Sequence, residues 1–335
     1  MSQTKTITLS EVAQLAEVST SAVSRTFTPG ASVAPATRER VLQAARTLGY
    51  RPNAIARTLT TKRSRIIGVV VSYLQNQFYP VVIEKLSQAL QQHGYHVLLF
   101  VSDGHETGAD IDDQLMDVMQ YQVDGLVLAS VTLSSALAQG CQAAGVPVVL
   151  FNRTAPIEGV HQVASDNQEG GRLAAETLLQ AGCRKMAYIA GLEDASTQVE
   201  REQGFVARLK EAGMTLTARA CGRYSYEGAR EATRLLFSGK DRPDGVFVAN
   251  DHMALAVLDT LRSELGLKVP QDVAVIGFDN VPQSAWPAYA LTTIEQDASG
   301  MVDATVDVLL QSFKAQTVTA RRVVKPVRLI QRGTV

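Results

Sequence analysis

The stretch TLSEVAQLAEVSTSAVSRTF, residues 8–27, predicts two short helices separated by a tight turn. Thr8 and Glu11 have the spacing of a capping box, in which the hydroxyl accepts from a backbone N–H and the carboxylate reaches back. Ser19 is a favourable N-cap for the second helix. The first helix carries apolar residues at helical spacing: Val12, Leu15 and Ala16. Helices this short cannot bury a core as a pair, so a third element must complete the unit.

A third helix is expected from about Pro35 to Leu48, and Gly49 ends it. It directs Val41, Leu42 and Ala45 toward the first two helices, which direct Ala22, Val23 and Phe27 inward. The outward residues of the second helix are short hydroxyls and one arginine: Thr20, Ser21, Ser24 and Arg25. Such side chains suit base edges and phosphates, and a helix pair of this kind places its second helix in the major groove of DNA.

Charge supports this interpretation. The chain up to Arg63 holds nine Lys or Arg and three carboxylates, a net +6, whereas the whole chain is −1, so the remainder carries −7. A small basic domain on an acidic body is typical of a nucleic-acid contact. The alternative, a helical dimerisation module with a solvated basic face, explains neither the turn nor the segment that follows.

That segment is RPNAIARTLTTKRSR, residues 51–65. Beyond Gly49, Pro52 prevents the third helix from continuing, and Asn53 can cap a new helix from Ala54 to Leu59. A helix of about two turns is too short to be stable alone. We therefore expect a partner, either a second copy of the chain or DNA, to order it.

These first 65 residues closely resemble the LacI/GalR family of bacterial transcription regulators, and the resemblance continues to the C-terminus. It implies a cytoplasmic, operator-associated homodimer on a pseudo-palindromic site, with paired hinge helices in the minor groove. There Leu59 would wedge between base pairs beside Ala56, a step whose unstacking cost is offset by new contacts. The DNA contacts that it implies are Thr8, Leu9, Ser19, Thr20, Ser21, Ser24, Arg25, Asn53, Ala56 and Leu59.

The sequence from Ile66 onward predicts parallel α/β structure. Apolar runs separated by helical stretches recur from Ile66 onward: IIGVVVS, HVLLFVS, GLVLAS, VPVVLFN, KMAYIAG, GVFVAND and VAVIGFD. Asp124-Gly125 matches Asp244-Gly245 in a second copy of the pattern, which indicates two similar lobes. The resemblance implies the same periplasmic-binding-protein-like architecture. We expect a helix-turn-helix domain over 1–52, a hinge over 53–64, a first lobe over 65–163 plus 295–325, and a second over 164–294 plus 326–335.

A ligand of two such lobes would bind between them, beyond the carboxyl ends of the strands. Polar residues follow four strands, although an Asp or Asn there is often only a helix N-cap. Residue-by-residue resemblance implies effector contacts at Phe78, Tyr79, Asn152, Asp166, Thr197, Arg201, Tyr224, Asn250 and Asp279. Polar groups around an aromatic face suit a sugar. A phosphorylated sugar, bound through Arg153 and Arg201, or a nucleobase stacked on the aromatics stays open.

The sequence contains no nucleotide-binding loop, nucleophile elbow or zinc-protease motif, so no catalytic residue, metal or cofactor is expected. Three cysteines without metal spacing and a polar N-terminus predict reduced thiols in a cytosolic protein. No apolar stretch approaches the ~20 residues that span a membrane. One recognition helix contacts one half-site of a two-fold operator, so specific DNA binding predicts a dimer. A dimer is also expected because no leucine-heptad tail, which the family's tetramers carry, follows the last apolar strand in this sequence.

Two departures from the family pattern stand out. Ala34 occupies a position where a serine or threonine often caps the third helix, and Thr28 replaces a common asparagine. We expect a regulator, most simply a repressor, whose operator affinity depends on a small molecule acting as inducer or corepressor. The alternatives are a nucleobase-responsive corepressor-type regulator and a sugar-binding module without DNA activity.

Overall fold

The computed structural model describes residues 7–28, 30–51, 63–102, 108–131, 133–314 and 319–335. The chain divides into two units, Met1–Ser64 and Arg65–Val335, hereafter the headpiece and the core. The predicted hinge helix from Ala54 to Leu59, with Asn53 and Ala56, lies outside the described residues.

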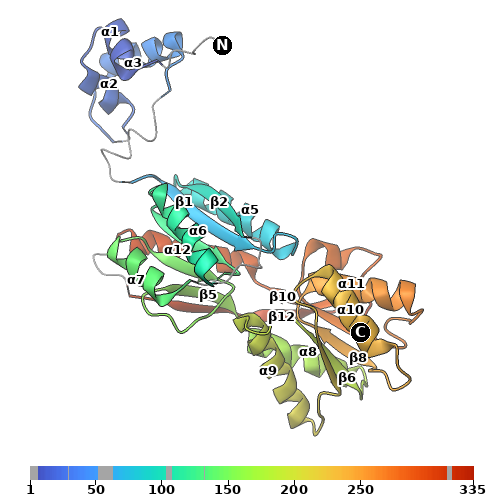
Figure 1. The fold of residues 1–335 in the computed structure, drawn as a ribbon. Helices are drawn as coiled ribbons and strands as arrows, with labels where there is room; N and C mark the ends of the chain where they lie inside the picture. The colour runs from blue at the N-terminus through green and yellow to red at the C-terminus, as the bar shows by residue number, and fades with distance from the viewer. Residues whose placement is uncertain (1–6, 29, 52–62, 103–107, 132, 315–318) are drawn as a thin grey trace. The chain divides into compact units, whose positions relative to one another are not determined.

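The headpiece contains three helices, α1 (Leu9–Leu15), α2 (Thr20–Thr26) and α3 (Pro35–Leu48), coloured dark blue in Figure 1. The predicted capping box is confirmed, because the Thr8 N–H donates to Glu11 at 2.7 Å and the Glu11 N–H donates to the Thr8 hydroxyl at 3.3 Å. Ser19 caps α2 through the Ala22 N–H. Gly49 ends α3 with a φ of 68°, as predicted for a left-handed C-cap.

The headpiece core is small and built from short apolar side chains: Val12, Ala13, Ala16, Val23, Val41, Ala44 and Ala45. Of the three apolar residues noted at helical spacing in α1, Val12 and Ala16 are buried, whereas Leu15 is 50% exposed and Ala13 is buried in its place. Ala34, at the N-cap of α3, forms no side-chain hydrogen bond to the helix, as expected for an alanine at this position. Arg38 donates to the carbonyls of Thr26 and Ala31, and this bridge helps to tie α3 to the end of α2.

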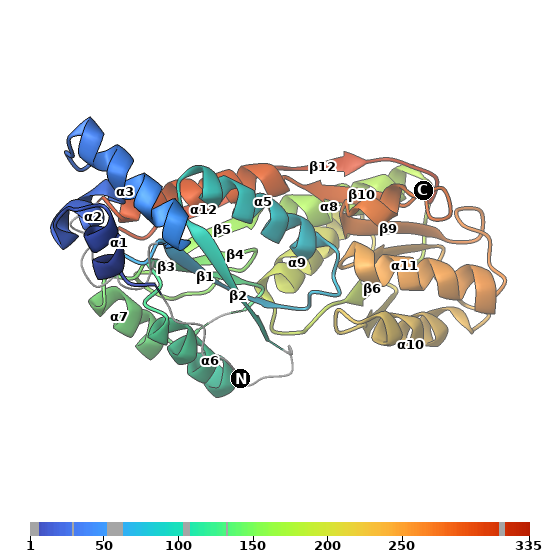
Figure 2. The ribbon, with the colours of Figure 1, turned by 90° about the horizontal axis from the view of Figure 1, so that it is seen from above.

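The first lobe of the core is a parallel sheet in the order β11-β5-β4-β3-β1-β2. Helices α5 and α12 cover one face and α6 and α7 the other (Figure 2). The strands are β1 (Ile66–Ser72), β2 (His96–Ser102), β3 (Gly125–Ala129), β4 (Val148–Phe151), β5 (His161–Ser165) and β11 (Arg322–Lys325). The helices are α5 (Phe78–Gln92), α6 (Gly108–Gln120), α7 (Ser135–Ala143) and α12 (Ala298–Ser312).

The second lobe repeats this plan in the order β12-β10-β9-β8-β6-β7, with only β12 antiparallel to its neighbour among the described strands. Its strands are β6 (Met186–Ala190), β7 (Ala218–Cys221), β8 (Gly245–Val248), β9 (Ala274–Asp279), β10 (Thr292–Gln296) and β12 (Val327–Ile330). Its helices are α8 (Asn167–Gln180), α9 (Ser196–Glu211), α10 (Tyr226–Phe237) and α11 (Asp251–Asp259), followed by a π-helical turn (Thr260–Glu264). A short 3-10 helix (Pro282–Ala285) follows β9.

Within the described residues the chain passes between the lobes three times, after β5, β10 and β11. The crossings are bonded to one another, since the Ser165 hydroxyl donates to Gln296 at 2.8 Å and the Asp166 N–H donates to the Lys325 carbonyl. Two expected boundaries shift slightly: residue 163 lies inside β5, and residue 295 lies inside β10. Pro326 lies between β11 and β12, which belong to different sheets.

Helices α8 and α9 pack through two glycines. A Cβ added at Gly171 would lie 2.1 Å from the Arg201 carbonyl oxygen, and one added at Gly204 would lie 2.0 Å from that of Gln168. Only glycine permits so close an approach of two helix backbones. The approach brings Arg201 of α9 beside Asn167 at the start of α8.

Replacing Gly171 by Ala should therefore destabilise the core by about 1–3 kcal/mol, because the new methyl group clashes with backbone. Gly140→Ala in α7 is the matched control, since nothing lies within 4 Å of its added Cβ. That control should stabilise the protein by about 0.5–1 kcal/mol, the helix preference for Ala over Gly. Urea unfolding of both variants measures the difference, and equal stability would contradict the close helix contact.

Candidate functional site

The headpiece presents the predicted polar surface on α2. Thr20, Ser21, Ser24 and Arg25 are all exposed, and so is the capping residue Ser19. The Arg25 Nε–H donates to the Ser21 carbonyl at 3.4 Å. Thr8 is exposed at the start of α1, and Leu9 beside it is half-buried. The remaining expected DNA contacts, Asn53, Ala56 and Leu59, lie outside the described residues.

A small cavity between the two lobes of the core holds most of the predicted effector residues. It is lined by Tyr73, Asn76, Tyr79, Ser130, Asn152, Thr197, Arg201, Tyr224, Asn250 and Asp279. Its volume is about 20 Å³, enough for one water molecule but far below the ~300 Å³ of ordinary ligand pockets. A larger molecule therefore needs more space between the lobes than this cavity offers in the present arrangement.

The backbone of the lining is unusual. Five lining residues have a positive φ: Tyr73 (61°), Ser130 (65°), Asn152 (56°), Tyr224 (56°) and Asp279 (126°). Residues with side chains rarely adopt such angles, which cost about 1–3 kcal/mol each and cluster at functional sites. Each of the five lies at or just beyond a strand end. The cavity is therefore a place where the fold maintains backbone strain.

Three polar atoms on the lining are buried and lack a hydrogen-bond partner among the described residues: Asn152 Oδ1, Asn250 Nδ2 and Asp279 Oδ2. The other amide atoms are used, since Asn152 Nδ2 donates to the Tyr79 hydroxyl and Asn250 Oδ1 accepts from the Met253 N–H. An unsatisfied buried polar atom costs about 1–3 kcal/mol. Two acceptors and one donor around one cavity are suited to a ligand with several hydroxyl groups.

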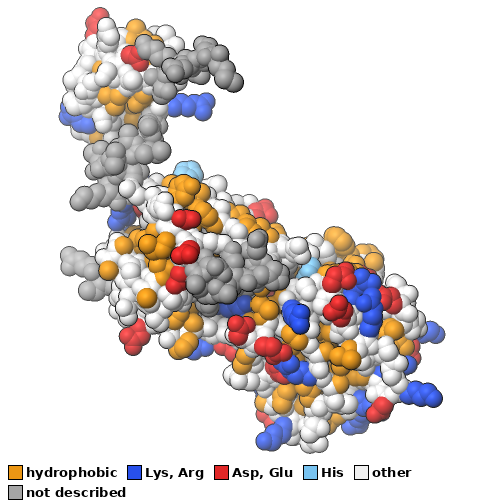
Figure 3. Space-filling model, viewed as in Figure 1, with side chains coloured by type: hydrophobic (Ala, Val, Ile, Leu, Met, Phe, Trp, Pro, Cys, Tyr) orange, Lys and Arg blue, Asp and Glu red, His pale blue; other side chains and the backbone are white. Residues whose placement is uncertain are grey.

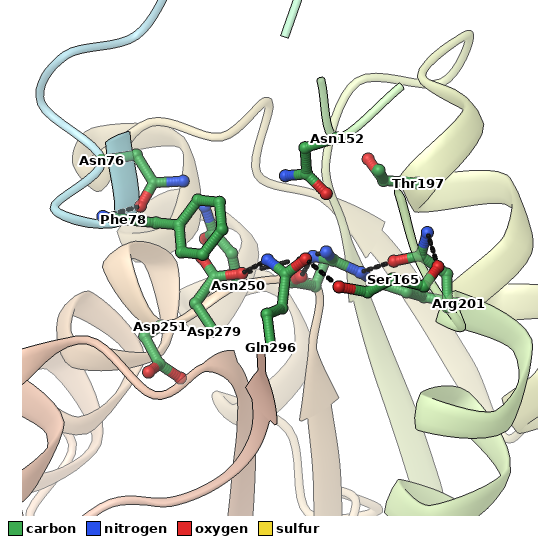
Figure 4. Close-up of polar contacts among 12 residues, drawn as sticks. Asn76, Phe78, Asn152, Ser165, Thr197, Arg201, Asn250, Asp251, Asp279 and Gln296 are labelled. Atoms are coloured by element: carbon green, nitrogen blue, oxygen red, sulfur yellow. Dashed lines mark hydrogen bonds and ion pairs between the residues drawn. The ribbon is translucent and has the colours of Figure 1, made fainter. Parts of the chain in front are cut away.

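Arg201 is the most constrained side chain of the site. Only 2% exposed, it donates to Asn167 Oδ1 at 2.9 Å and to the Ala249 carbonyl at 2.5 Å. Its guanidinium lies over the Phe278 ring at 3.6 Å from the centroid and 3.8 Å from Asp279 Oδ1. Figure 4 shows the adjoining polar row, in which Gln296 links Asp279 to Ser165.

Burial raises the pKa of Asp279 to about 7, although the charge of Arg201 opposes this effect. Asp251 lies behind it, and its carboxylate accepts from the Thr293 hydroxyl at 2.6 Å and from the Val281 N–H at 2.9 Å. Burial raises the pKa of Asp251 to about 6. Burial is the largest cause of the raised pKa of Asp279, and the nearby Asp251 carboxyl adds to it, so Asp279 is partly protonated near neutral pH and can then donate a hydrogen bond.

Two predicted effector residues do not line this cavity. Phe78 borders a neighbouring cavity of about 300 Å³ that shares Asp279 with the first. Asp166 caps α8 by accepting from the Glu169 N–H, which is the ordinary role of an Asp after a strand, and its contact with the effector stays a prediction. Three lining residues, Tyr73, Asn76 and Ser130, were not among the predicted effector contacts. Ser130 directly follows the run GLVLA and so could have been found as a polar strand end.

Other kinds of site find no support in the described part of the chain. Its helices include none long and apolar enough to cross a membrane. Among the same residues, no group of three His, Cys, Asp or Glu side chains is placed to hold a metal ion.

The fold and the cavity define a protein with a helix-turn-helix headpiece and a two-lobed core of the periplasmic-binding-protein class. Comparison with known families agrees: residues 8–53 match the model for bacterial regulatory proteins of the lacI family, and residues 175–335 match that for a periplasmic binding protein-like domain. The chain belongs to the LacI family of bacterial regulatory proteins.

Similar proteins cover nearly the whole chain. The ribose operon repressor of Escherichia coli K12 is 31% identical over 331 residues, 98% of this chain and 99% of that protein. A transcriptional regulator CelR–cellobiose complex is 32% identical with a TM-score of 0.72, over 98% of this chain and 100% of that one. The lac repressor dimer bound to operator and the anti-inducer ONPF is 28% identical with a TM-score of 0.87, over 98% and 99%.

The raised pKa of Asp279 predicts a pH effect on stability. Between its usual value of 3.8 and about 7, the folded chain holds a proton that the unfolded chain has released. Stability from this group therefore falls as pH rises through that window. Urea unfolding at several pH values measures the effect. As pH rises from about 4 to 7, the free energy of unfolding of the wild type should fall relative to that of Asp279→Asn. A wild type that gains on the variant instead would mean that Arg201 keeps Asp279 charged.

Proposed function

We propose that this protein is a homodimeric transcriptional regulator, most simply a repressor, whose affinity for operator DNA is controlled by a small polyhydroxylated molecule bound between the core lobes. The main support for a ligand at this place is that three buried polar atoms of the cavity lining have no hydrogen-bond partner among the described residues. The backbone of the same lining is strained. Membership of a family of bacterial regulatory proteins argues against a sugar-binding module without DNA activity.

The proposed ligand contacts are the polar residues of the lining. Asn152 and Asn250 supply an acceptor and a donor, and Asp279 accepts or donates according to its proton. Sugar hydroxyls donate and accept at once, so they can pair with all three. The ribose repressor and the cellobiose complex among the relatives make a sugar the leading class. The tyrosines of the lining keep a nucleobase as the second candidate, because they offer rings for stacking.

The proposed DNA contacts are the exposed polar side chains of α2. Short side chains at Thr20, Ser21 and Ser24 let the helix approach base edges closely, and Arg25 can pair with a phosphate or a guanine. These few contacts leave part of the specificity to DNA shape. We assign the remaining contacts, Asn53, Ala56 and Leu59, by family resemblance alone.

A second copy of the chain is the partner that we propose for the first lobe. Strand β2 is the edge of the described sheet, and two of its apolar side chains are exposed, Leu99 at 40% and Val101 at 50%. Met116 and Tyr121, in and just after α6, are exposed as well. Figure 3 shows apolar side chains on the visible face of this lobe. An exposed apolar sheet edge invites pairing with another chain, and the operator-bound relative is a dimer.

Coupling between ligand and DNA follows from the lobe contacts. In this closed arrangement the Thr154 N–H donates to the Ser196 hydroxyl at 2.9 Å, and the Thr154 hydroxyl donates to Glu200 at 3.1 Å. A ligand too large for the cavity must change these contacts and thus the angle between the lobes. It changes operator affinity by as much as it favours one angle over the other.

The protein acts by binding alone in this proposal, with no resident cofactor. We place it in the bacterial cytoplasm, where its DNA lies. The sign of the effect, induction or corepression, is set by which lobe angle the ligand favours.

The DNA proposal is tested on the sequence that the full-length protein selects from random DNA. Affinity should fall steeply with salt. Arg25→Gln should weaken binding by about tenfold or more, the value of one charged DNA contact. Arg172→Gln is the matched control, because it also removes one positive charge but from the core, where Arg172 pairs with Glu211. Equal binding of selected and unrelated DNA would exclude a specific regulator.

The ligand proposal is tested with Asn250→Asp. The carboxylate keeps the cap on α11 but replaces the unpartnered donor Nδ2 with an acceptor. The ligand concentration that changes operator affinity should rise by about tenfold or more, while operator affinity without ligand stays the same. Ser134→Asp, which adds one carboxylate at the N-cap of α7, is the control and should respond normally. A normal response of Asn250→Asp would place the ligand elsewhere.

A further inference from the structure

The core buries a second arginine, Arg153, which has no acidic partner among the described residues. Arg153 follows Asn152 just after β4 and is 6% exposed. Its guanidinium donates to the carbonyl and hydroxyl oxygens of Ser130, both at 3.4 Å, and to the Thr197 hydroxyl at 3.5 Å. All three contacts are longer than the 2.7–3.2 Å that is usual, ~2.9 Å being the commonest value, and all three acceptors are neutral.

Arg201 provides the comparison, because it is the other buried arginine of the described residues. Its hydrogen bonds measure 2.5 and 2.9 Å, and the carboxyl of Asp279 lies 3.8 Å from its guanidinium. Within the same residues, no carboxylate lies within 4.0 Å of Arg153. A buried charge without an opposite charge is costly, so this arrangement is improved by any bound group that brings one.

The position of Arg153 relates this charge to the ligand. Two of its three bonds go to the Ser130 and Thr197 hydroxyls, and both residues line the cavity. The described lining itself contains one cation, Arg201, and one carboxyl, Asp279, which lie 3.8 Å apart, so this carboxyl is already beside Arg201. A neutral ligand would leave the charge of Arg153 uncompensated, whereas an anion beside Ser130 would balance it.

We propose that the effector carries an anionic group, the carboxylate of a sugar acid or the phosphate of a sugar phosphate, which Arg153 binds at the Ser130–Thr197 side of the cavity. This inference deepens the proposed function and rests on it. The planar guanidinium offers paired N–H groups that match both oxyanions. Because Arg153 joins Ser130 of the first lobe to Thr197 of the second, an anion there would also replace a contact between the lobes.

The experiment measures ligand-induced thermal shifts of the full-length protein with matched sets. Each set contains a neutral sugar, its aldonic or uronic acid and its phosphate ester, for example glucose, gluconate, glucuronate and glucose 6-phosphate. Inorganic phosphate at the same ionic strength as a chloride control is added as a minimal anion. The wild type, Arg153→Gln, Arg153→Lys and the distant control Arg172→Gln are compared.

We expect an anionic member to give the largest shift in the wild type, and the acid and phosphate arms to show which anion is bound. Its dissociation constant should rise about tenfold or more in Arg153→Gln, less in Arg153→Lys, and not at all in Arg172→Gln. A neutral sugar that binds best, or anion responses equal in the wild type and Arg153→Gln across every set and phosphate, would overturn the proposal. Operator affinity, recorded separately, distinguishes this failure from failure of the proposed regulation.

Discussion

The guanidinium of Arg201 is the group on which the architecture of the cleft depends. It is buried in the second lobe, where an unpaired charge would cost several kcal/mol. Asn167, the Ala249 carbonyl and the Phe278 ring surround it, and they come from three different elements or their ends. This set of contacts requires α8 and α9 to approach as closely as Gly171 and Gly204 allow. The same contacts hold Asp279 at a fixed place in the cleft.

Around this fixed point the lining is strained and polar. The apolar sheets behind it stabilise backbone angles that five lining residues would otherwise avoid. The site is therefore preorganised, while the lobes themselves are joined, in the described part of the chain, by three crossings and a few hydrogen bonds. Rigid lobes with a narrow connection give a two-state element that a ligand can bias.

Much of the fold could be predicted because it follows from local patterns. The long apolar runs became the strands, and Thr8, Ser19 and Gly49 became caps, since a cap depends on neighbours in sequence. The differences arose where tertiary packing decides. Leu15 has helical spacing but is half exposed among the described residues, and Asp166 caps its own helix and is not part of the cavity lining. Tyr73 and Asn76 reach the cleft through a loop whose course no periodicity reveals.

The central claim is that the angle between the lobes controls DNA binding. Thr154 and Ser196 are neighbours across the cleft, so Thr154→Cys combined with Ser196→Cys can lock the closed arrangement by a disulfide. The most direct measurement is the operator affinity of this full-length double variant, reduced and oxidised, with and without the effector. We predict that the reduced double variant responds to the effector and that the oxidised double variant does not. In each single-cysteine variant, the reduced and the oxidised protein should respond alike. An oxidised protein that still responds as the reduced one does would contradict the account.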